Sequence, residues 1–479
     1  MAKKLDAQTR AAAAVVPSAR QLAWQRLEFY AFLHFGMNTF TNSEWGTGRE
    51  DPALFQPQAL DCLQWAKIIR AAGMRGMLLT AKHHDGFCLW PTKTTEHSVA
   101  SSPWREGRGD VVREAADAAR AAGLAFGLYL SPWDMHAPSY GTGKAYDDFY
   151  LCQLRELLTN YGELFCVWLD GACGEGKNGR KQIYDMERYV ALIRELQPNA
   201  VISVCGPDVR WCGNEAGVCR SSEWSVVPWY HSEAERVAAA SQKEGGKPPK
   251  IDAAEPDLGS RKAIRKAGRL IWYPAEVDVS IRPGWFYHEK EDYAIKPLAK
   301  LREIYYKSVG ANAAMLLNIP PTPEGKIHER DKDTLLSLGA QLKIDFKENL
   351  AEGGTLSATQ SRDARHSAQM ALDANPAHYW HSGAFGAPVE LVLDLGEDFD
   401  INKVALQEHI ESGQQIEKCS LWWDANLTGR GEPKWERLEK FTVVGHKRLI
   451  RFSERRMQRL KLVIEEARGF ATLESFRAY

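Results

Sequence analysis

The sequence predicts an α/β protein with a (β/α)8-type barrel followed by a C-terminal antiparallel β-sandwich. Three observations support this fold class. Short apolar, strand-like runs alternate with helix-like segments between about residues 31 and 318. The pattern changes after the proline-rich stretch at 320–323. Beyond about residue 350, short alternating runs are separated by turn residues every eight to twelve positions or so, which is typical of a sandwich. We therefore expect a catalytic barrel over 1–345 and a sandwich over 346–479.

The expected barrel elements follow one another in a regular order. Strands are predicted at 29–34, 74–80, 126–131, 164–170, 200–205, 223–227, 271–276 and 314–318. Helices are predicted at 60–72, 110–122, 145–161, 184–196 and 295–309, with Asp110 as a cap and Gly123 as a stop. The charged stretch 232–270 is expected to be an elaborated loop over one end of the barrel. A helix at 331–342 should precede sandwich strands at 389–395, 403–409, 418–423, 448–452 and 459–464.

Length and charge limit the classes of function. A chain of 479 residues is long enough for two or three domains. Its net charge of −1 gives no reason to expect a nucleic-acid partner or an anionic membrane surface. No stretch has the roughly 20 apolar residues of a membrane span. The N-terminus carries no signal-peptide hydrophobic region, so the compartment stays open: periplasmic or secreted if a signal was removed, otherwise cytoplasmic.

Asp170 is the most informative residue. It ends the nearly uninterrupted apolar run 164–169, as expected for a strand buried on both faces. A barrel places its chemistry at the carboxyl ends of its strands. Asp-Gly is also a common turn pair, so Asp170 alone is equally compatible with a structural role. Other polar and aromatic groups also follow predicted strands: His34, Glu44, Trp45, His83, His84, Tyr129, Trp133, Glu215, Glu276 and Trp285.

This set of residues favours carboxylate chemistry on a sugar. The sequence holds 16 tryptophans, and indole rings stack on the apolar faces of sugars. A neutral histidine can both donate to and accept from a hydroxyl. Neighbouring His83 and His84 diverge on an extended chain, and the barrel segment contains no His-x-x-x-His or His-x-His pair, so neither a metal nor another cofactor is expected. No Gly-x-Ser-x-Gly elbow, phosphate loop or dinucleotide fingerprint is present.

Glycosidic bonds are cleaved by two carboxyl groups, one of which acts as the acid. Asp170 is the leading nucleophile, while Glu215, Glu276 and Glu44 compete for the role of acid/base. Each of the three could instead be a salt-bridged or capping residue.

Five segments together resemble glycoside hydrolase family 29, the α-L-fucosidases. They are FLHFGM at 32–37, AKHHDGFCLWP at 81–91, YLSPW at 129–133, WLDG at 168–171 and LLNIPP at 316–321. The resemblance implies a (β/α) barrel and retaining hydrolysis with Asp170 as nucleophile. It also implies that His34, His83, His84, Tyr129 and Trp168 hold the fucose, that Glu44 and Trp45 lie near the sugar, and that Trp285 lies by its methyl group.

The segment WCGNEAG at 211–217 resembles the branch of the family that acts on α-1,3 and α-1,4 linkages. There the glutamate after Gly-Asn is the acid/base, which favours Glu215 over Glu276; Glu276 otherwise belongs with the sugar-binding residues. The C-terminal part resembles a discoidin-like sandwich at 371–375, 379–382 and 392–396, a module that binds sugars or braces a catalytic domain.

The expected function is therefore retaining exo-α-L-fucosidase action on a fucosylated oligosaccharide or glycoconjugate. Two alternatives stay open: a non-catalytic fucose- or glycan-binding protein, and a metal-dependent hydrolase on a barrel.

Overall fold

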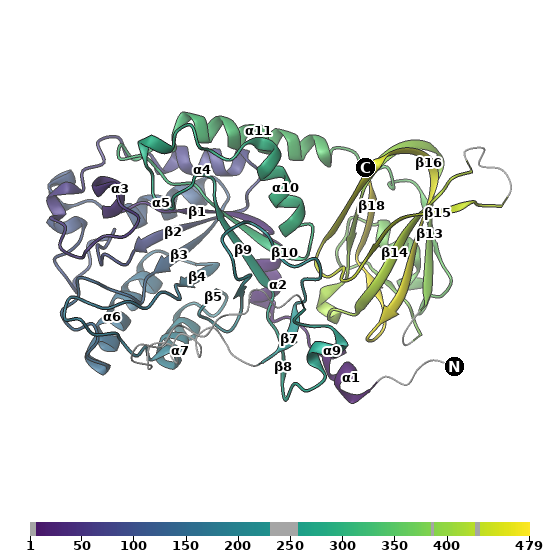
Figure 1. Ribbon diagram of the computed structural model, residues 1–479, viewed down its shortest axis with the longest axis horizontal. Coiled ribbons are helices and arrows are strands. Elements are labelled where there is room, and N and C mark those ends of the chain that lie inside the picture. The colour runs from purple at the N-terminus through teal and green to yellow at the C-terminus, as the bar shows by residue number, and fades with distance from the viewer. Residues whose placement is uncertain (1–5, 230–256, 385–387, 427–431) are drawn as a thin grey trace.

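The N-terminal part of the chain is a barrel of parallel strands. The computed structural model describes residues 6–229, 257–384, 388–426 and 432–479 (Figure 1). The barrel strands are hydrogen-bonded in the order β5-β4-β3-β2-β1-β10-β9-β6, and a parallel bridge between Ser203 and Val209 links the two end strands. Their bounds are β1 (Phe29–Leu33), β2 (Gly76–Lys82), β3 (Ala125–Leu130), β4 (Cys166–Leu169), β5 (Val201–Val204), β6 (Arg210–Trp211), β9 (Ala275–Ser280) and β10 (Ala313–Asn318). The predicted fold class is confirmed.

Helices surround this sheet at the predicted places. The side chain of Asp110 accepts a hydrogen bond from the Arg113 amide at 2.8 Å and caps α5, and Gly123 follows the helix with a φ of +68°, a conformation that favours glycine. The helices of the barrel domain are α1 (Ala7–Ala13), α2 (Ala19–Gln25), α3 (Met37–Thr41), α4 (Cys62–Ala71), α5 (Val111–Ala121), α6 (Lys144–Asn160), α7 (Met186–Leu196), α9 (Arg261–Ile264), α10 (Leu298–Ser308) and α11 (Glu329–Asp345).

Two barrel strands differ from the prediction. The segments expected to be strands six and seven contribute β7 (Val226–Pro228) and β8 (Leu270–Trp272), which pair antiparallel with each other outside the barrel. Their places in the barrel belong to β6 and β9. The two-residue β6 contains a buried arginine, Arg210, so it leaves no apolar run to detect. Most of the charged stretch 232–270 lies outside the described residues.

The C-terminal part is an antiparallel sandwich. Its main sheet has the order β11-β13-β16-β14-β15, with β18 beside β13. The bounds are β11 (Thr355–Ala358), β12 (Trp380–His381), β13 (Val389–Gln407), β14 (Ile416–Asp424), β15 (Trp435–Phe441), β16 (Arg448–Ala467), β17 (Thr472–Leu473) and β18 (Ser475–Ala478). Strands predicted separately at 389–395 and 403–409 form one long strand, β13, whose pairing with β16 is interrupted by register shifts.

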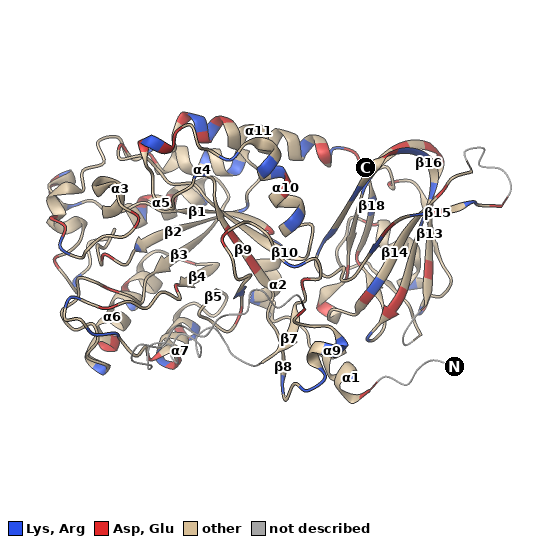
Figure 2. Cartoon of the chain, in the orientation of Figure 1, with Lys and Arg blue, Asp and Glu red and all other residues tan. Residues whose placement is uncertain are grey.

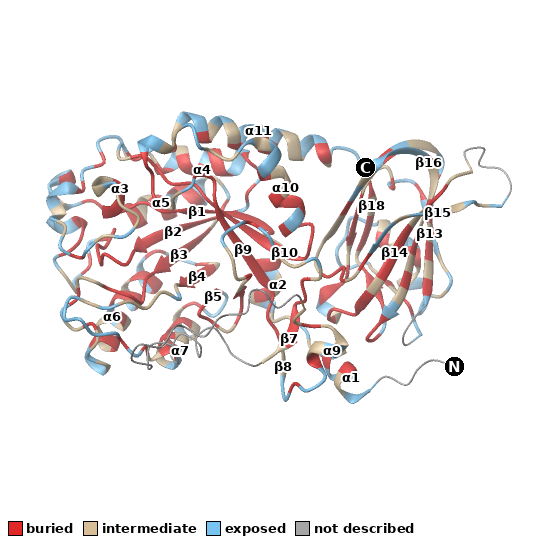
Figure 3. Cartoon of the chain, in the orientation of Figure 1, coloured by how far each residue is buried: buried red, intermediate tan, exposed pale blue. Residues whose placement is uncertain are grey.

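The barrel and the sandwich each have their own core of buried residues. Strands of the barrel are buried almost throughout, whereas β13 alternates between buried and partly exposed positions (Figure 3). In the barrel domain, charged residues lie mainly on the outer helices and loops, but β9 carries acidic residues within the barrel, and strands of the sandwich carry charged residues as well (Figure 2). None of the described helices has the length and apolar composition needed to cross a bilayer.

Candidate active site

Asp170 lies at the carboxyl end of β4, where the strand meets solvent. Its side chain is 23% exposed, and its Oδ2 atom accepts a hydrogen bond from the Tyr129 hydroxyl at 3.0 Å. The Ala172 amide donates to Oδ1 at 2.7 Å. Burial raises the pKa of Tyr129 well above its usual range, and the neighbouring Asp170 charge adds to this, so the phenol stays protonated and donates to the carboxylate. The carboxylate is thus held in one orientation while one edge stays accessible.

Three histidines from the ends of β1 and β2 lie beside Asp170. His83 stacks on Tyr129 at 5.7 Å between ring centroids, and the His84 ring lies 4.1 Å from that of His83. His84 Nε2 is 3.9 Å from Asp170 Oδ2. Burial lowers the pKa of His34 to about 3 and also depresses the pKa values of His83 and His84. All three imidazoles are therefore neutral at physiological pH, each with one donor and one acceptor nitrogen.

Neighbouring side chains fix which nitrogen of each ring carries the proton. Asn38 Nδ2 lies 3.2 Å from the Glu44 carbonyl, which can only accept, and the same Nδ2 lies 3.3 Å from His83 Nδ1. His83 Nδ1 is therefore an acceptor, which leaves its proton on Nε2.

His34 and His84 have the opposite tautomer, with the proton on Nδ1. Asn318 Nδ2 donates to the Trp285 carbonyl, so its Oδ1 accepts from His34 Nδ1 at 2.8 Å. Ser131 uses its one proton on the Trp133 carbonyl and so accepts from His84 Nδ1 at 2.7 Å. His34 and His84 thus offer an acceptor Nε2, and His83 offers a donor Nε2.

Replacing Asn38 with aspartate should reverse the tautomer of His83. A carboxylate can only accept, so His83 would move its proton to Nδ1 and lose its Nε2 donor. Loss of one such hydrogen bond should raise KM for a fucoside about tenfold to a hundredfold. Nitrogen chemical shifts of the His83 ring would report the tautomer directly. Asn42→Asp is the matched control, because the contact of Asn42 Oδ1 with His288 survives the change. A wild-type His83 protonated on Nδ1 would contradict the assignment.

Glu215 and Trp285 close one side of this cluster. Trp285 lies 5.1 Å from His34 between ring centroids, and its indole Nε1 donates to Glu215 Oε2 at 3.2 Å. Glu215 is exposed. Glu215 is thus an exposed carboxyl at the rim, linked to the cluster through the Trp285 indole.

Glu44 holds the loop that carries Trp285. Its carboxylate accepts from the backbone amides of Trp285 and Phe286 at 2.8 and 3.1 Å, and lies 2.7 Å from His288 Nε2. A Cβ at Gly284 would lie 2.6 Å from Glu44 Oε1, so any other residue there would displace the Glu44 carboxyl group. Both oxygens of Glu44 are engaged, which favours a positioning role over an acid/base role.

Trp45 and Trp168 lie at opposite sides of the cluster, Trp45 on the exposed side and Trp168 on the buried side. Trp45 is 62% exposed and meets the rings of His84 and Trp133 edge-on. Trp168 is buried and lies 5.3 Å from Tyr129 between ring centroids. Trp168 and Tyr129 therefore form a floor, and Trp45 stands at the rim.

Glu276 lies inside the barrel behind that floor. It is fully buried, and its carboxyl accepts from the Trp168 indole at 2.6 Å and from the Tyr30 hydroxyl. Burial raises the pKa of Glu276 to about 7 despite these donors. On the same strand, burial raises the pKa of Asp278 well above its usual range, while the Trp211 indole donates to its Oδ1 at 2.6 Å. The geometry therefore favours Glu215 over Glu276 as the acid.

The buried carboxyl of Glu276 should make stability depend on pH. Its folded pKa of about 7 exceeds the ordinary 4.5, so the folded state holds the proton more tightly. Its contribution is complete below about pH 4.5 and is lost as pH rises through 7, which amounts to about 3 kcal/mol. Glu276→Gln should remove this part of the pH dependence in denaturant unfolding, whereas Glu289→Gln, at an exposed site, should not. An unchanged slope in Glu276→Gln would show that the carboxyl is ionised in the folded protein.

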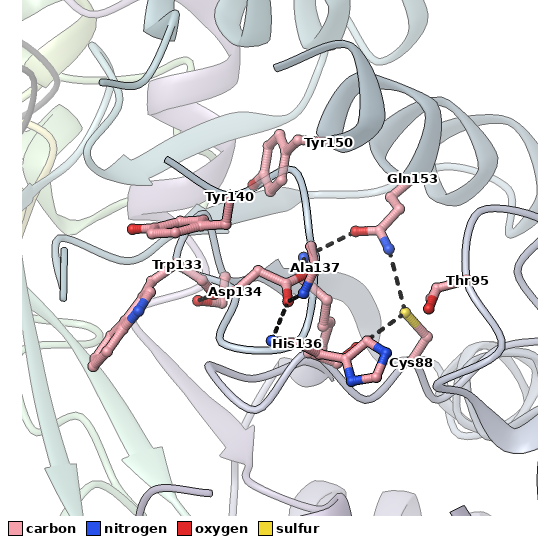
Figure 4. A network of polar contacts seen from close by, with 12 residues as sticks. Cys88, Thr95, Trp133, Asp134, His136, Ala137, Tyr140, Tyr150 and Gln153 are labelled. Carbon is pink, nitrogen blue, oxygen red and sulfur yellow. Dashed lines mark hydrogen bonds and ion pairs between the residues drawn. The ribbon is translucent and has the colours of Figure 1, made fainter. Parts of the chain in front are cut away.

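A buried ion pair supports the strand ends that carry His84 and Trp133. Lys82 Nζ lies 2.8 Å from Asp134 Oδ2 and 2.9 Å from Gln153 Oε1. Asp134 in turn accepts from the amides of His136 and Ala137 (Figure 4). Burial alone would raise the pKa of Asp134, but Lys82 and these amides hold it below its usual range. The network fixes the turn after β3, where Trp133 packs against His84.

The structure brings most of the predicted site residues together. Asp170, Tyr129, His34, His83, His84, Trp168, Trp285 and Glu215 are linked by the contacts above. Among the described residues, no group of three or more histidine, cysteine, aspartate or glutamate side chains has the arrangement of a metal site.

Sequence reasoning assigned no role to Asn38, Ser131 or Asn318, which set the histidine tautomers. Ser131 and Asn318 lie at or just after the ends of predicted strands, a position that could have marked them. Asn38 lies in α3, and no local pattern points to it.

Comparisons with known proteins show the family of the chain. A family model described as Alpha-L-fucosidase matches residues 27–346. Alpha-L-fucosidase 1 of Arabidopsis thaliana is 42% identical over 95% of this chain and 85% of its own length.

Solved structures extend the similarity over nearly the whole chain. A GH29 fucosidase from Ruminococcus gnavus, solved in complex with fucose, is 28% identical with a TM-score of 0.82, covering 100% of this chain and 96% of its own. A glycoside hydrolase 29 family member from an unknown rumen bacterium is 36% identical with a TM-score of 0.79, covering 97% of this chain and 77% of its own. The chain therefore belongs to the α-L-fucosidase family of glycoside hydrolases.

Proposed function

We propose that the protein is a retaining exo-α-L-fucosidase with Asp170 as nucleophile and Glu215 as acid/base. The observation that carries this proposal is the Asp170 carboxylate, held by Tyr129 at the barrel mouth beside three neutral histidines. Family membership supports the substrate class, terminal α-L-fucosyl residues of oligosaccharides or glycoconjugates.

The reaction proceeds in two displacements. Asp170 attacks the anomeric carbon as the bond to the leaving oxygen breaks, and Glu215 gives its proton to that oxygen. Glu215 then takes a proton from water, which attacks the same carbon and releases fucose and the Asp170 carboxylate. For retention the two carboxyl groups should lie about 5–5.5 Å apart in the complex with substrate.

The histidine cluster gives the sugar its orientation. His83 donates to one sugar hydroxyl oxygen, whereas His34 and His84 accept hydroxyl protons. Trp285 and Trp45 supply apolar faces at the rim, and the buried Tyr129 and Trp168 form a floor. A floor closed by buried aromatic rings fits removal of a terminal sugar.

We further propose that the enzyme prefers α-1,3 and α-1,4 linkages on branched glycans. The segment around Gly213, Asn214 and Glu215 supports this preference, as does the exposed position of Glu215 at the rim, where a branched leaving group can approach. Hydrolysis rates on branched α-1,3/1,4-fucosylated and linear α-1,2-fucosylated oligosaccharides measure it. Faster hydrolysis of the α-1,2 substrate would overturn the preference.

We also propose a domain boundary between residues 345 and 346. Helix α11 ends at Asp345, and the buried cluster of the sandwich begins at Ala351.

Trapping the covalent intermediate tests the mechanism. A 2-deoxy-2-fluoro fucoside with an activated leaving group should inactivate the enzyme and leave one sugar on Asp170, detected by peptide mass spectrometry. A label on another residue, or turnover that yields the inverted anomer, would contradict the proposal.

A further inference from the structure

The segment 212–225, which carries Glu215, is anchored to the sandwich. The Arg448 guanidinium donates to the Ser221 carbonyl at 2.9 Å, and the Ser225 amide donates to Gln414 Oε1 at 2.8 Å. Thr442 forms a hydrogen bond with the Ser222 hydroxyl. Each of these sandwich residues thus holds a different point between 221 and 225.

Asn312 adds a second connection across the interface. Its Nδ2 donates to the Glu223 carbonyl at 2.7 Å, while its Oδ1 accepts from the His446 amide at 2.7 Å. Asn312 has a φ of +71°, a conformation that asparagine tolerates better than most residues. One barrel side chain therefore ties the Glu215 segment to the loop before β16.

The C-terminal end of the segment is also bound to β6, the strand that directly precedes the segment in the sequence. Glu223 is fully buried and forms ion pairs with Arg210 of β6 and with Arg220. Arg210 also donates to the Trp224 carbonyl at 2.8 Å. The segment is therefore a loop whose two ends meet, with the sandwich packed against the returning end.

Between these anchors, Glu215 lies on a short turn, and the residues after it contact α10: a Cβ at Gly217 would lie 2.9 Å from Ile304, and Cys219 Sγ donates to the Lys307 carbonyl at 3.0 Å. Asn214 accepts from the Ala216 amide at 3.0 Å and donates to the Val218 carbonyl at 2.8 Å, which shapes the turn. Glu215 itself is exposed and meets the Trp285 indole. Because little protein packs around its side chain, the position of Glu215 depends on how firmly the loop ends are held.

We propose that Arg448, Gln414 and Thr442 of the sandwich are positioning residues for the acid/base glutamate. The C-terminal module then acts as a brace for one half of the catalytic pair, while Asp170 is held by the barrel alone. This inference rests on the proposed role of Glu215.

The substrate dependence of an Arg448→Met variant tests the brace. Misplacing an acid by a fraction of an ångström should slow substrates that need protonation of a poor leaving group, roughly tenfold or more in kcat. An activated aryl fucoside, whose leaving group needs little protonation, should be cleaved at nearly the wild-type rate in the fucosylation step. Gln414→Leu should show the same selective loss, and Gln414→Glu, which keeps an acceptor for the Ser225 amide, should recover most of it.

Lys447→Met provides the matched control. Lys447 neighbours Arg448 and pairs across the same interface, but with Glu28 at the start of β1 rather than with the Glu215 segment. It should lower stability without separating the two substrates. Should Arg448→Met fold poorly, Thr442→Val offers a milder loss of one hydrogen bond.

The results distinguish the positioning role of the sandwich residues from the acid/base role of Glu215. Glu215→Ala is measured beside the other variants. A selective loss in Glu215→Ala but not in Arg448→Met and Gln414→Leu would overturn the brace alone. A selective loss in none of them would overturn the role of Glu215, and with it this inference. Equal slowing of both substrates in Arg448→Met and Lys447→Met would show that the interface contributes only stability.

Discussion

Replacing Asp170 with asparagine should reduce turnover of every fucoside, activated or not, by at least about a thousandfold, the scale on which loss of a covalent nucleophile acts. Asparagine keeps the shape of the side chain, and its one oxygen can still accept from the Ala172 amide while its NH2 group donates to the Tyr129 hydroxyl, so the site should stay folded. What it lacks is the negative charge that attacks the anomeric carbon. Steady-state rates on an aryl fucoside and on a fucosylated oligosaccharide measure the loss.

An aspartate outside the cluster provides the comparison. Asp185 caps α7, and asparagine is an equally good cap, so Asp185→Asn should keep wild-type activity. Added azide should restore some turnover to Asp170→Ala or Asp170→Gly, with an inverted fucosyl azide as product, because the small anion fills the space of the missing carboxylate. Near-normal turnover in Asp170→Asn would refute the nucleophile. If the wild-type protein bound a fucosylated oligosaccharide without cleaving it, the non-catalytic alternative would replace the enzyme.

Replacing Glu215 with alanine should produce a different pattern, in which the loss depends on the leaving group. Oligosaccharides need the acid and should lose about a hundredfold to ten-thousandfold in kcat/KM. An aryl fucoside with an acidic phenol should keep most of its first-step rate and then accumulate the fucosyl-enzyme, because no base activates water. The measurements are kcat/KM across a series of phenols and the initial burst of released phenol.

Azide distinguishes Glu215 from its competitor inside the barrel. In Glu215→Ala the anion should attack the accumulated fucosyl-enzyme and give a fucosyl azide of retained configuration. Glu276→Gln should need no rescue, since its carboxyl lies behind Trp168 and already accepts from Trp168 and Tyr30. Rescue of a Glu276 variant in place of Glu215→Ala would reverse the two assignments.

The sequence was sufficient to predict features that depend on long apolar runs. Strand β4 and the carboxylate at its tip could be recognised because a strand buried on both faces reads as a nearly continuous apolar run, and Asp170 ends that run. The cap of α5 at Asp110 could also be predicted, because it depends only on residues next to it in the sequence. Strand β6 could not be predicted, because its two residues include a buried arginine whose partners, the Glu223 carboxylate and the carbonyls of Trp224 and Tyr273, lie thirteen or more positions later.

The sequence predicts which residues belong to the candidate site but not which atoms they contact. Sequence reasoning could name Glu44, Glu215 and Glu276 as carboxyls near strand ends. Only the fold shows that Glu276 points into the barrel and that Glu44 is occupied by the amides of Trp285 and Phe286. The tautomer of His34 depends on Asn318, and the tautomer of His83 depends on Asn38. Each asparagine lies far from its histidine in the sequence, so no spacing rule could reveal either contact.

Closure of the barrel bears on how the protein forms during synthesis. Strand β1 pairs with β10, with Phe29 opposite Met315, and Glu28 just before β1 pairs with Lys447. During synthesis β1 therefore waits for β10 until Met315 has been made, and Glu28 waits for Lys447, which follows it by 419 positions. Synthesis of β10 and of Lys447, rather than of Asp170 and Glu215, should therefore set the moment at which activity first appears.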